Sequence, residues 1–242
     1  MVLIKSTRTN KVYTLFTDFP PHLLIRPGME WVIAKYAESV IIDNRAFRFL
    51  RRGQTPVFDI AALMRMVKTV WQVTDTEDVY FIMPDTGDAE KTIKLFQRWR
   101  RKFEEYANLA VVIHEYPKMF DKYLELDADL YCIPCNRFTF EKLKGPCKQT
   151  STIDFDVVLE VIDKLASTGA KIHLLGPCKK LLVYLDKYCR HEFTFDSMRY
   201  KWLSRQPRTH RAMITKNDDR MKWLRKWLGK DFKIIETVKT RV

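Results

Sequence analysis

Short, almost wholly apolar runs alternate with longer amphipathic stretches from about residue 39 onward. The runs are rich in β-branched residues, which is typical of strands that are buried on both faces of a sheet. The predicted strands are SVIID (39–43), DVYFIMPD (78–85), LAVVIHE (109–115), LYCIPC (130–135), AKIHLLG (170–176) and EFTFDS (192–197).

The stretches between these runs carry apolar residues at steps of three and four, which predicts helices. The predicted helices cover residues 59–73, 88–106, 117–126, 154–168 and 177–188. Asp88 is placed to cap the second of them, Pro117 to open the third and Gly169 to end the fourth.

Repeated strand–helix units indicate a parallel sheet covered by helices, and their number favours a TIM-like barrel over a short open sheet. We therefore expect an α/β fold, a TIM-like (β/α) barrel that need not be complete or regular, with a basic C-terminal extension. One domain is expected over residues 1–242. Its parts are a hairpin and lead-in helix (1–38), the barrel core (39–202) and a basic helix and strand (203–242).

The charge of the chain narrows the choice of partner. Lys and Arg number 43 against 30 Asp and Glu, a net charge of +13. Such an excess favours nucleic acid, although a merely charged surface is the plain alternative. Trp223 and Trp227 lie four apart and are expected to face the core. The expected nucleic-acid-binding residues are Arg45, Arg199, Lys201, Arg205, Arg208 and Arg211.

Other features limit the cofactors and the compartment. The five cysteines are an odd number, which argues against a disulfide framework. Cys132 and Cys135 lie in an apolar run without two further close ligands, which favours buried thiols over zinc. No apolar run approaches the roughly 18 residues of a membrane span, and the apolar part of the N-terminal segment is too short for a signal peptide. We expect a cytoplasmic protein (in the host cytoplasm if it is viral) without cofactor or metal, and a homodimer is left open.

Three of the predicted strands finish on an aspartate: Asp43, Asp85 and Asp196. The carboxyl ends of parallel strands meet at one end of a barrel, so these carboxylates should converge there. Each alone is equally an ordinary turn or cap residue. His114 and His173 lie in two further strands, where a histidine contacts a substrate or simply donates to a carbonyl in the core.

The ordered motifs IIDNRAFRFLRRG, IMPDTGDAEKTIKLFQRW, VVIHEYP, KIHLLGPCKKLL and FTFDSMRYKW resemble the tRNA-guanine transglycosylase superfamily. The likeness is greatest to its short branch, the phage and bacterial DNA 7-deazaguanine transglycosylases. It covers residues 38–202, and HLLG with FDSMRYKW is the most telling pair. The resemblance implies a pentosyltransferase that replaces guanine in nucleic acid with a 7-deazaguanine, without cutting the strand.

The resemblance also implies roles for individual residues. Asp196 aligns with the nucleophile that bonds to the anomeric carbon, and Asp43 with a general acid/base. Asp85 aligns with the carboxylate that reads the base edge, and His114 with a side chain placed against the base. We group Gly87, His173 and Ser197 with them as substrate-binding residues.

The chain departs from the family pattern in three places. Asn44 and Arg45 stand where the family has small residues, so that Arg45 either crowds the pocket or binds a phosphate. YCIPC replaces a glycine-rich strand, and the C-terminal zinc motif of the tRNA enzymes is absent, which favours DNA over tRNA. Two other hypotheses remain: a non-catalytic nucleic-acid-binding barrel, and a barrel enzyme for a small phosphorylated metabolite, with GPCKK as a weak phosphate loop.

Overall fold

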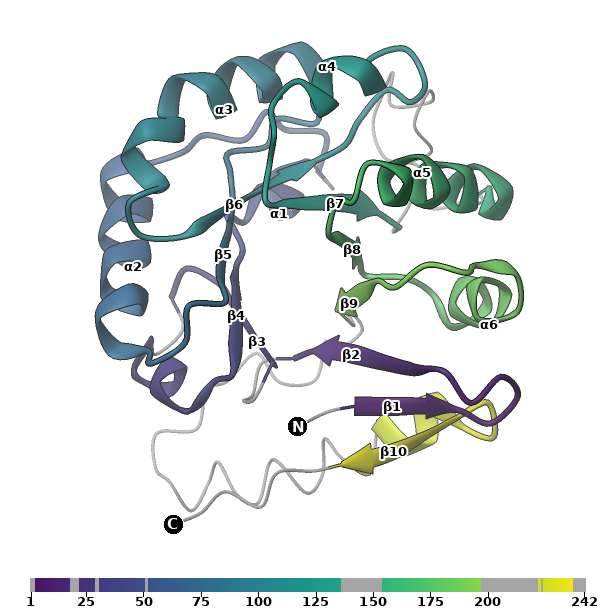
Figure 1. Cartoon of the computed structure of the whole chain (residues 1–242). Helices are drawn as coiled ribbons and strands as arrows, with labels where there is room; N and C mark the ends of the chain where they lie inside the picture. The colour runs from purple at the N-terminus through teal and green to yellow at the C-terminus, as the bar shows by residue number, and fades with distance from the viewer. Residues whose placement is uncertain are drawn as a thin grey trace.

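The computed structural model describes residues 3–17, 22–28, 31–50, 52–135, 154–196, 222 and 224–236. These residues form a mixed α/β structure around a curled ten-stranded sheet (Figure 1). The strands are β1 (Leu3–Ser6), β2 (Val12–Phe16), β3 (His22–Ile25), β4 (Ser39–Ile42), β5 (Val79–Ile82), β6 (Asn108–Val112), β7 (Leu130–Pro134), β8 (Ile172–Leu175), β9 (Thr194–Asp196) and β10 (Phe232–Glu236). The helices are the 3-10 helix η1 (Trp31–Tyr36) and the α-helices α1 (Ala46–Leu50), α2 (Ile60–Val73), α3 (Ala89–Phe103), α4 (Phe120–Leu124), α5 (Phe155–Ser167) and α6 (Lys179–Tyr188).

The strands from β2 to β9 are parallel to their neighbours and curl around a common centre (Figure 1). β3, at one end of the sheet, returns to β2 through an isolated parallel bridge between Thr17 and Leu23. Thr17 donates its N–H to the carbonyl of His22 at 2.8 Å, and Leu24 donates to Thr17 at 2.6 Å. β1 and β10 extend the sheet beyond β2 as an antiparallel pair. The described fold is therefore barrel-like, with helices outside the curled sheet.

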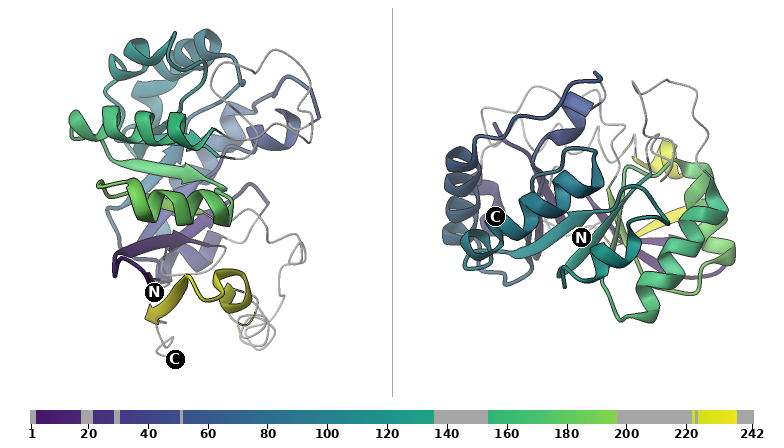
Figure 2. Two further views of the ribbon diagram at one scale, coloured as in Figure 1. Left: turned by 90° about the vertical axis from the view of Figure 1, so that its right-hand side faces the viewer. Right: turned by 90° about the horizontal axis from the view of Figure 1, so that it is seen from above.

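Alternation along each strand divides the apolar residues between two cores, because successive side chains point to opposite faces. One set lies inside the curl: Phe16, Leu24, Ile41, Tyr80, Ile82, Ala110, Val112, Leu130 and Cys132. The larger set packs beneath the helices, which lie outside the curled sheet (Figure 2). β5, β6 and β7 each contribute two residues, two positions apart, to the inner set.

Two predicted helix boundaries are confirmed and one is wrong. Asp88 caps α3 by accepting the N–H of Lys91 at 3.0 Å, and Gly169 follows α5 with a φ of 77°. Pro117 does not open α4. It follows a cis bond, and its carbonyl accepts the N–H of Phe120 in a turn, so that the helix begins only at Phe120.

The N-terminal segment contributes more to the sheet than its sequence suggests. β1 and β2 form the predicted hairpin, with Ile4 opposite Tyr13, and the predicted lead-in helix is η1. Strands of the curled sheet nevertheless begin before residue 39, since β2 is parallel to β9 and β3 is parallel to β4. Among the described residues, no helix has the length and apolar character needed to cross a bilayer.

Candidate active site at the carboxyl ends of the strands

One pocket lies at the carboxyl ends of β3 to β9, and Asp43, Asp85, His114 and Asp196 all line it. The empty space in it, counted together with the open solvent at its mouth, is about 600 Å³. Its apolar walls are formed by Leu24, Leu50, Ile82, Val112, Pro134 and Leu175. The three strand-end aspartates therefore converge around a single apolar pocket, a setting in which carboxylate pKa values shift strongly.

Asp85 and His114 form a buried pair at the ends of β5 and β6. The Nε2 atom of His114 lies 2.7 Å from Oδ1 of Asp85. The same oxygen accepts the N–H of Gly87 at 2.8 Å and the hydroxyl of Thr92 at 3.3 Å. Burial by itself would raise the pKa of Asp85, but His114 and then the other donors hold that pKa below its usual value. Asp85 is therefore an ionised carboxylate whose second oxygen, Oδ2, makes none of these bonds.

Asp196 ends β9 in a quite different environment, with 1% of its surface exposed. Its Oδ1 atom accepts the backbone N–H of Gly176, and its Oδ2 atom has no hydrogen-bond partner among the described residues. Burial, reinforced by the charge of Asp43, raises the pKa of Asp196 to about 7, even though the Gly176 N–H opposes it. Near neutral pH this carboxyl group therefore exchanges readily between its protonated and ionised forms.

His173 lies beside Asp196 inside the curl and does not line the pocket. Its Nδ1 atom is 2.8 Å from the hydroxyl of Thr194, while its Nε2 atom is 3.8 Å from Oδ1 of Asp196. Burial lowers the pKa of His173 to about 3, so the ring is neutral and the two residues are not an ion pair. His173 therefore lies next to a carboxylate of the pocket and not on the pocket wall, where a substrate would contact it.

Asp43, Asn44 and Arg45 form a tightly held loop after β4. Asp43 accepts the N–H of Arg45 at 3.0 Å, which supports a left-handed φ of 66° at Arg45. The buried Asn44 donates to the carbonyl of Met83 at 2.6 Å and accepts the N–H of Ala46 at 2.7 Å. Asn44 thereby ties the end of β4 to the end of β5, so that the spacing of Asp43 and Asp85 is fixed by hydrogen bonds.

Burial also raises the pKa of Asp43, and the nearby charge of Asp85 adds to this effect. The Arg45 N–H and the guanidinium groups of Arg26 and Arg45 oppose it without reversing it. Burial raises the pKa of the Cys132 thiol, and the charges of Asp196, Asp43 and Asp85 raise it further. The charges of the three aspartates therefore all reach Cys132 inside the curl. The pKa values of the three carboxyl groups differ from one another.

The glycine of the β5 turn shapes the same pocket. Gly87 has a φ of 74°, a conformation that side chains rarely adopt. A Cβ atom at this position would lie only 2.8 Å from Cδ2 of Leu50, which lines the pocket. Gly87 thus permits a tight turn after β5 and leaves room for the pocket wall.

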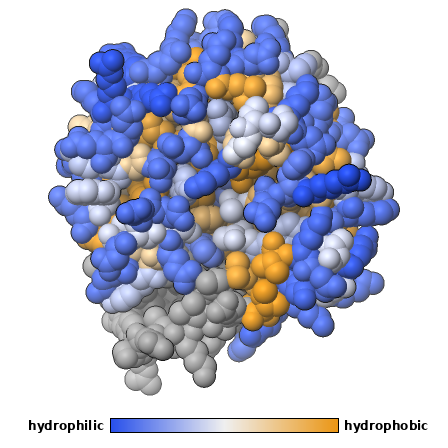
Figure 3. Space-filling model, viewed as in Figure 1, coloured by the Kyte–Doolittle hydropathy of each residue, from blue (hydrophilic) through white to orange (hydrophobic). Residues whose placement is uncertain are grey.

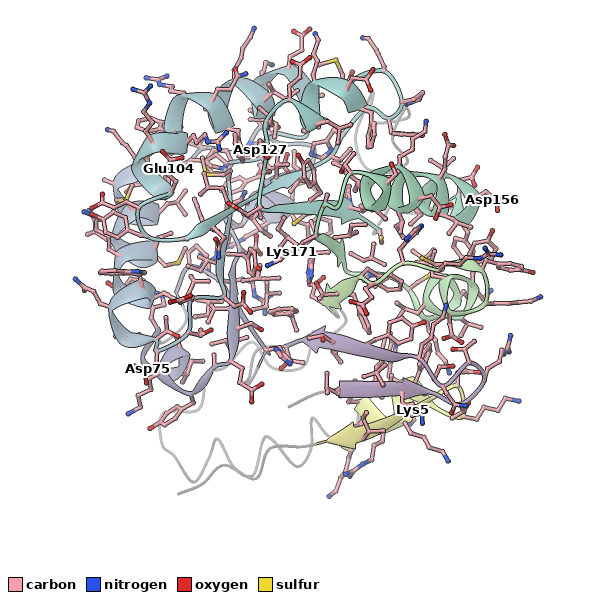
Figure 4. The ribbon with its side chains drawn as sticks, in the orientation of Figure 1. Lys5, Asp75, Glu104, Asp127, Asp156 and Lys171 are labelled. Carbon is pink, nitrogen blue, oxygen red and sulfur yellow. The ribbon has the colours of Figure 1, made fainter. Side chains whose placement is uncertain are left out.

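The opposite end of the curl is closed by polar groups that bond to one another. Figure 4 is seen from this end, and its labels mark Asp75, Glu104, Asp127 and Lys171, which precede β5, β6, β7 and β8 along the chain. Lys171 donates to the hydroxyl of Tyr80 at 2.7 Å, and Tyr80 donates to Asp78 at 3.2 Å. Figure 3 shows mostly hydrophilic side chains over the same side of the molecule. The pocket lined by the three aspartates lies at the other end of the curl, where the parallel strands finish.

The remaining predicted site residues fall into two groups. Arg45 does not line the pocket, and its guanidinium lies instead beside Gly28. The expected substrate contact Ser197 and the expected cations Arg199, Lys201, Arg205, Arg208 and Arg211 lie outside the described residues. Trp227 is partly buried against the core, as predicted, whereas the side chain of Trp223 lies outside the described set.

Sequence reasoning missed the residues that support the aspartates. Asn44 and Thr92 hold the loops after β4 and β5, and Gly176 supplies the N–H to Asp196. That N–H is consequently taken, which weakens GPCKK as a phosphate loop. Of these residues, only Asn44 could have been predicted from the sequence, because an asparagine just before a helix commonly accepts a backbone N–H.

Cys132 and Cys135 are both fully buried, as predicted for small apolar residues. Cys132 belongs to the inner core, and Cys135 to the core beneath the helices. Within the described ranges, no group of three or more His, Cys, Asp or Glu side chains is arranged to hold a metal ion.

Compared with known proteins, the sequence matches no protein-family model and no curated protein. The class defined by the described residues is a mixed α/β protein with a barrel-like sheet. Its candidate active site is a carboxylate-lined pocket at the carboxyl ends of the parallel strands.

Proposed function

We propose that the fold is an irregular TIM-like (β/α) barrel and that the pocket exchanges a base in nucleic acid. The observation that carries this proposal is the convergence of three strand-end aspartates with opposed pKa shifts. Asp85 is held ionised, whereas the pKa values of Asp43 and Asp196 are raised. Carboxyl groups with different proton affinities around one pocket are what acid–base and nucleophilic work at a sugar requires.

In the proposed first step, an ionised oxygen of Asp196 bonds to the anomeric carbon of the nucleotide while the bond from that carbon to guanine breaks. The protonated Asp43 gives its proton to the departing base. The unpartnered Oδ2 of Asp196 supports its role as nucleophile, because no described hydrogen bond has to break before attack. Dividing one difficult displacement into two easier ones is the general advantage of a covalent intermediate.

In the proposed second step, the 7-deazaguanine loses its ring proton to the carboxylate of Asp43 and attacks the anomeric carbon. The bond to Asp196 then breaks, and both carboxyl groups return to their starting states. The ionised Asp85, oriented by His114, accepts hydrogen bonds from the amino and ring N–H groups of either base. This role is supported by the bonds that fix its Oδ1 and leave Oδ2 uncommitted.

The substrate is proposed to be a nucleic acid, with DNA favoured over tRNA, and the place of action the cytoplasm. The net charge of +13 supports a polyanionic substrate. The target base must leave its stack to reach a carboxylate inside a pocket, and a pocket open at one end suits a flipped base.

The test is a base-exchange assay with nucleoside mass spectrometry. Purified protein is incubated with duplex DNA, single-stranded DNA or tRNA and with 7-deazaguanine bases, and the nucleosides are then analysed. We expect a 7-deazaguanine nucleoside in DNA, dependent on Asp196. The control is Asp163→Asn, because Asp163 is an exposed residue of α5 that does not line the aspartate pocket. Binding without exchange on any of the polymers would refute the enzymatic proposal and leave a nucleic-acid-binding barrel.

A further inference from the structure

Arginine side chains gather beside the pocket from two separate loops. Arg26 follows β3, while Arg45 and Arg48 lie in and after the loop that holds Asp43. Arg48 is exposed, and Arg26 and Arg45 are partly buried. A Cβ atom at Gly28 would lie 3.2 Å from Nη2 of Arg45, so the guanidinium of Arg45 reaches across to the loop after β3.

The guanidinium of Arg45 lies close enough to Arg48 and Arg26 to be repelled by both. After burial, the positive charge of Arg48 is the largest influence that lowers the pKa of Arg45, and Arg26 adds to it. Arg26 also acts on both Asp43 and Asp196, which places it on the pocket side of the cluster. Like charges gathered beside a pocket favour the binding of an anion there.

Two arginines of this cluster, Arg45 and Arg48, are not held in ion pairs by carboxylates of the described residues. Among the described residues, no ion pair or side-chain hydrogen bond involves the guanidinium of Arg45 or of Arg48. Arg45 is held in a left-handed backbone conformation by Asp43, an arrangement that costs energy and fixes where its side chain starts. The position of the cation is thus built into the loop that carries a candidate catalytic residue.

We propose that Arg45 and Arg48, with Arg26 behind them, bind the phosphodiester backbone of a nucleic-acid strand next to the nucleotide in the pocket. The choice of ligand rests on the proposed function, since phosphate oxygens are also carried by small metabolites. Guanidinium groups suit phosphate oxygens because their paired N–H donors match two oxygens at once. Arg45 therefore positions the strand at the edge of the pocket and does not block it.

The test measures strand binding separately from catalysis. A fluorescein-labelled single-stranded DNA 12-mer is titrated with the wild-type protein and with Arg45→Asn, Arg48→Gln and the double variant, at several salt concentrations. Asparagine tolerates a positive φ, so Arg45→Asn removes the charge without straining the loop. Arg65→Gln is the matched control, because Arg65 is an exposed arginine of α2 that neither belongs to the cluster nor lines the pocket.

Each single variant is expected to weaken binding roughly five- to tenfold, and to reduce the slope of log K against log salt by about 0.7. The control should bind like the wild type. Inorganic phosphate, at the same concentration of phosphate groups, should compete far less well than an unlabelled strand. Unchanged affinity and slope in the double variant would overturn the site, and equal competition by inorganic phosphate would assign it to a small phosphorylated ligand instead.

The outcome can be separated from that of the base-exchange assay. If the arginine variants weaken binding but the wild type exchanges no base, the strand site stands and the enzymatic proposal fails. If exchange occurs while the variants keep wild-type binding and KM for the strand, the enzymatic proposal stands and the strand site fails. Thermal melting of each variant shows that a loss of binding is not a loss of folding.

Discussion

The two ends of the curled sheet differ in how far their polar groups are hydrogen-bonded. At the amino end, Lys171, Tyr80 and Asp78 bond to one another in a chain. At the carboxyl end, the buried Asp196 keeps an oxygen without a partner among the described residues, and its pKa is raised to about 7. Buried polar groups with hydrogen-bond partners stabilise a fold, whereas buried carboxyl groups with unpaired oxygens and shifted pKa values are characteristic of functional sites.

The contrast explains why only one end of the sheet is a candidate active site. A carboxylate buried without full compensation costs stability, and a chain retains it where chemistry needs it. The chain of Lys171, Tyr80 and Asp78 has no such cost, because its donors and acceptors match, although the Nε2 atom of His22 at the start of β3 is buried without a partner among the described residues. Substitutions at the two ends should therefore change activity and stability in different ways.

The largest expected effect is the loss of activity in Asp196→Asn. Removal of the proposed nucleophile should lower the exchange rate by about a thousandfold or more. The rate is measured as modified nucleoside formed per minute under saturating substrate. Exchange within tenfold of the wild-type rate would exclude Asp196 as the nucleophile.

The same substitution should raise stability, most of all at high pH. The pKa of Asp196 in the folded protein is about 7, above its ordinary value of 3.8, so the folded state resists ionisation. Wild-type stability is therefore lost as the pH rises from about 4 to about 7. An asparagine does not titrate, and each pKa unit corresponds to about 1.4 kcal/mol. Urea unfolding should show Asp196→Asn more stable than the wild type at pH 8, with the difference vanishing near pH 4.

Asp43→Asn should have the next largest effect. A general acid or base contributes about a hundredfold or more to a rate, and asparagine cannot supply a proton. We expect kcat to fall by roughly that factor while KM for the strand changes little. The pH–rate profile of the variant should also lose the limb that belongs to Asp43. A kcat close to that of the wild type would remove this residue from the proposed mechanism.

Gly87→Ala should produce a moderate effect on both properties. The added Cβ would approach Leu50 at 2.8 Å and occupy a φ of 74°. We expect a loss of about 1–2 kcal/mol in the free energy of unfolding. Movement of Leu50 into the pocket should lower kcat/KM by about tenfold. Gly169→Ala is the control, because its Cβ would meet no atom within 4 Å and its φ of 77° imposes the same backbone cost.

The smallest effect on activity is expected at the amino end. Tyr80→Phe removes the hydroxyl that accepts from Lys171 and donates to Asp78. Loss of these bonds should reduce the free energy of unfolding by about 1 kcal/mol and leave exchange within twofold of wild type. A large loss of activity with little loss of stability would show that the amino end takes part in catalysis and would break the comparison.

Much of the core was predictable because buried parallel strands read as nearly continuous apolar runs. The runs 39–43 and 130–135 match β4 and β7 to within a residue. β2 and β3 were not recognised as strands of the parallel sheet. Their partners β9 and β4 are set by the closure of the sheet, which no local pattern of residues encodes.

The candidate site also has features that the sequence predicts and features that it does not. The convergence of Asp43, Asp85 and Asp196 could be predicted because strand ends meet in a parallel sheet. The pairing of His114 with Asp85 could not, since it depends on the heights at which β5 and β6 end relative to each other. The opposed pKa values of the aspartates likewise come from tertiary burial and single N–H donors.

The most direct test of the account is to trap and locate the covalent bond to Asp196. Wild-type protein is mixed with labelled DNA in the absence of a replacement base, separated on a denaturing gel and digested for tandem mass spectrometry. The account predicts a protein–DNA adduct on the peptide that contains Asp196, lost in Asp196→Asn and released when a 7-deazaguanine is added. An adduct on another residue, or retarded DNA in native gels with no adduct under denaturing conditions, would contradict it.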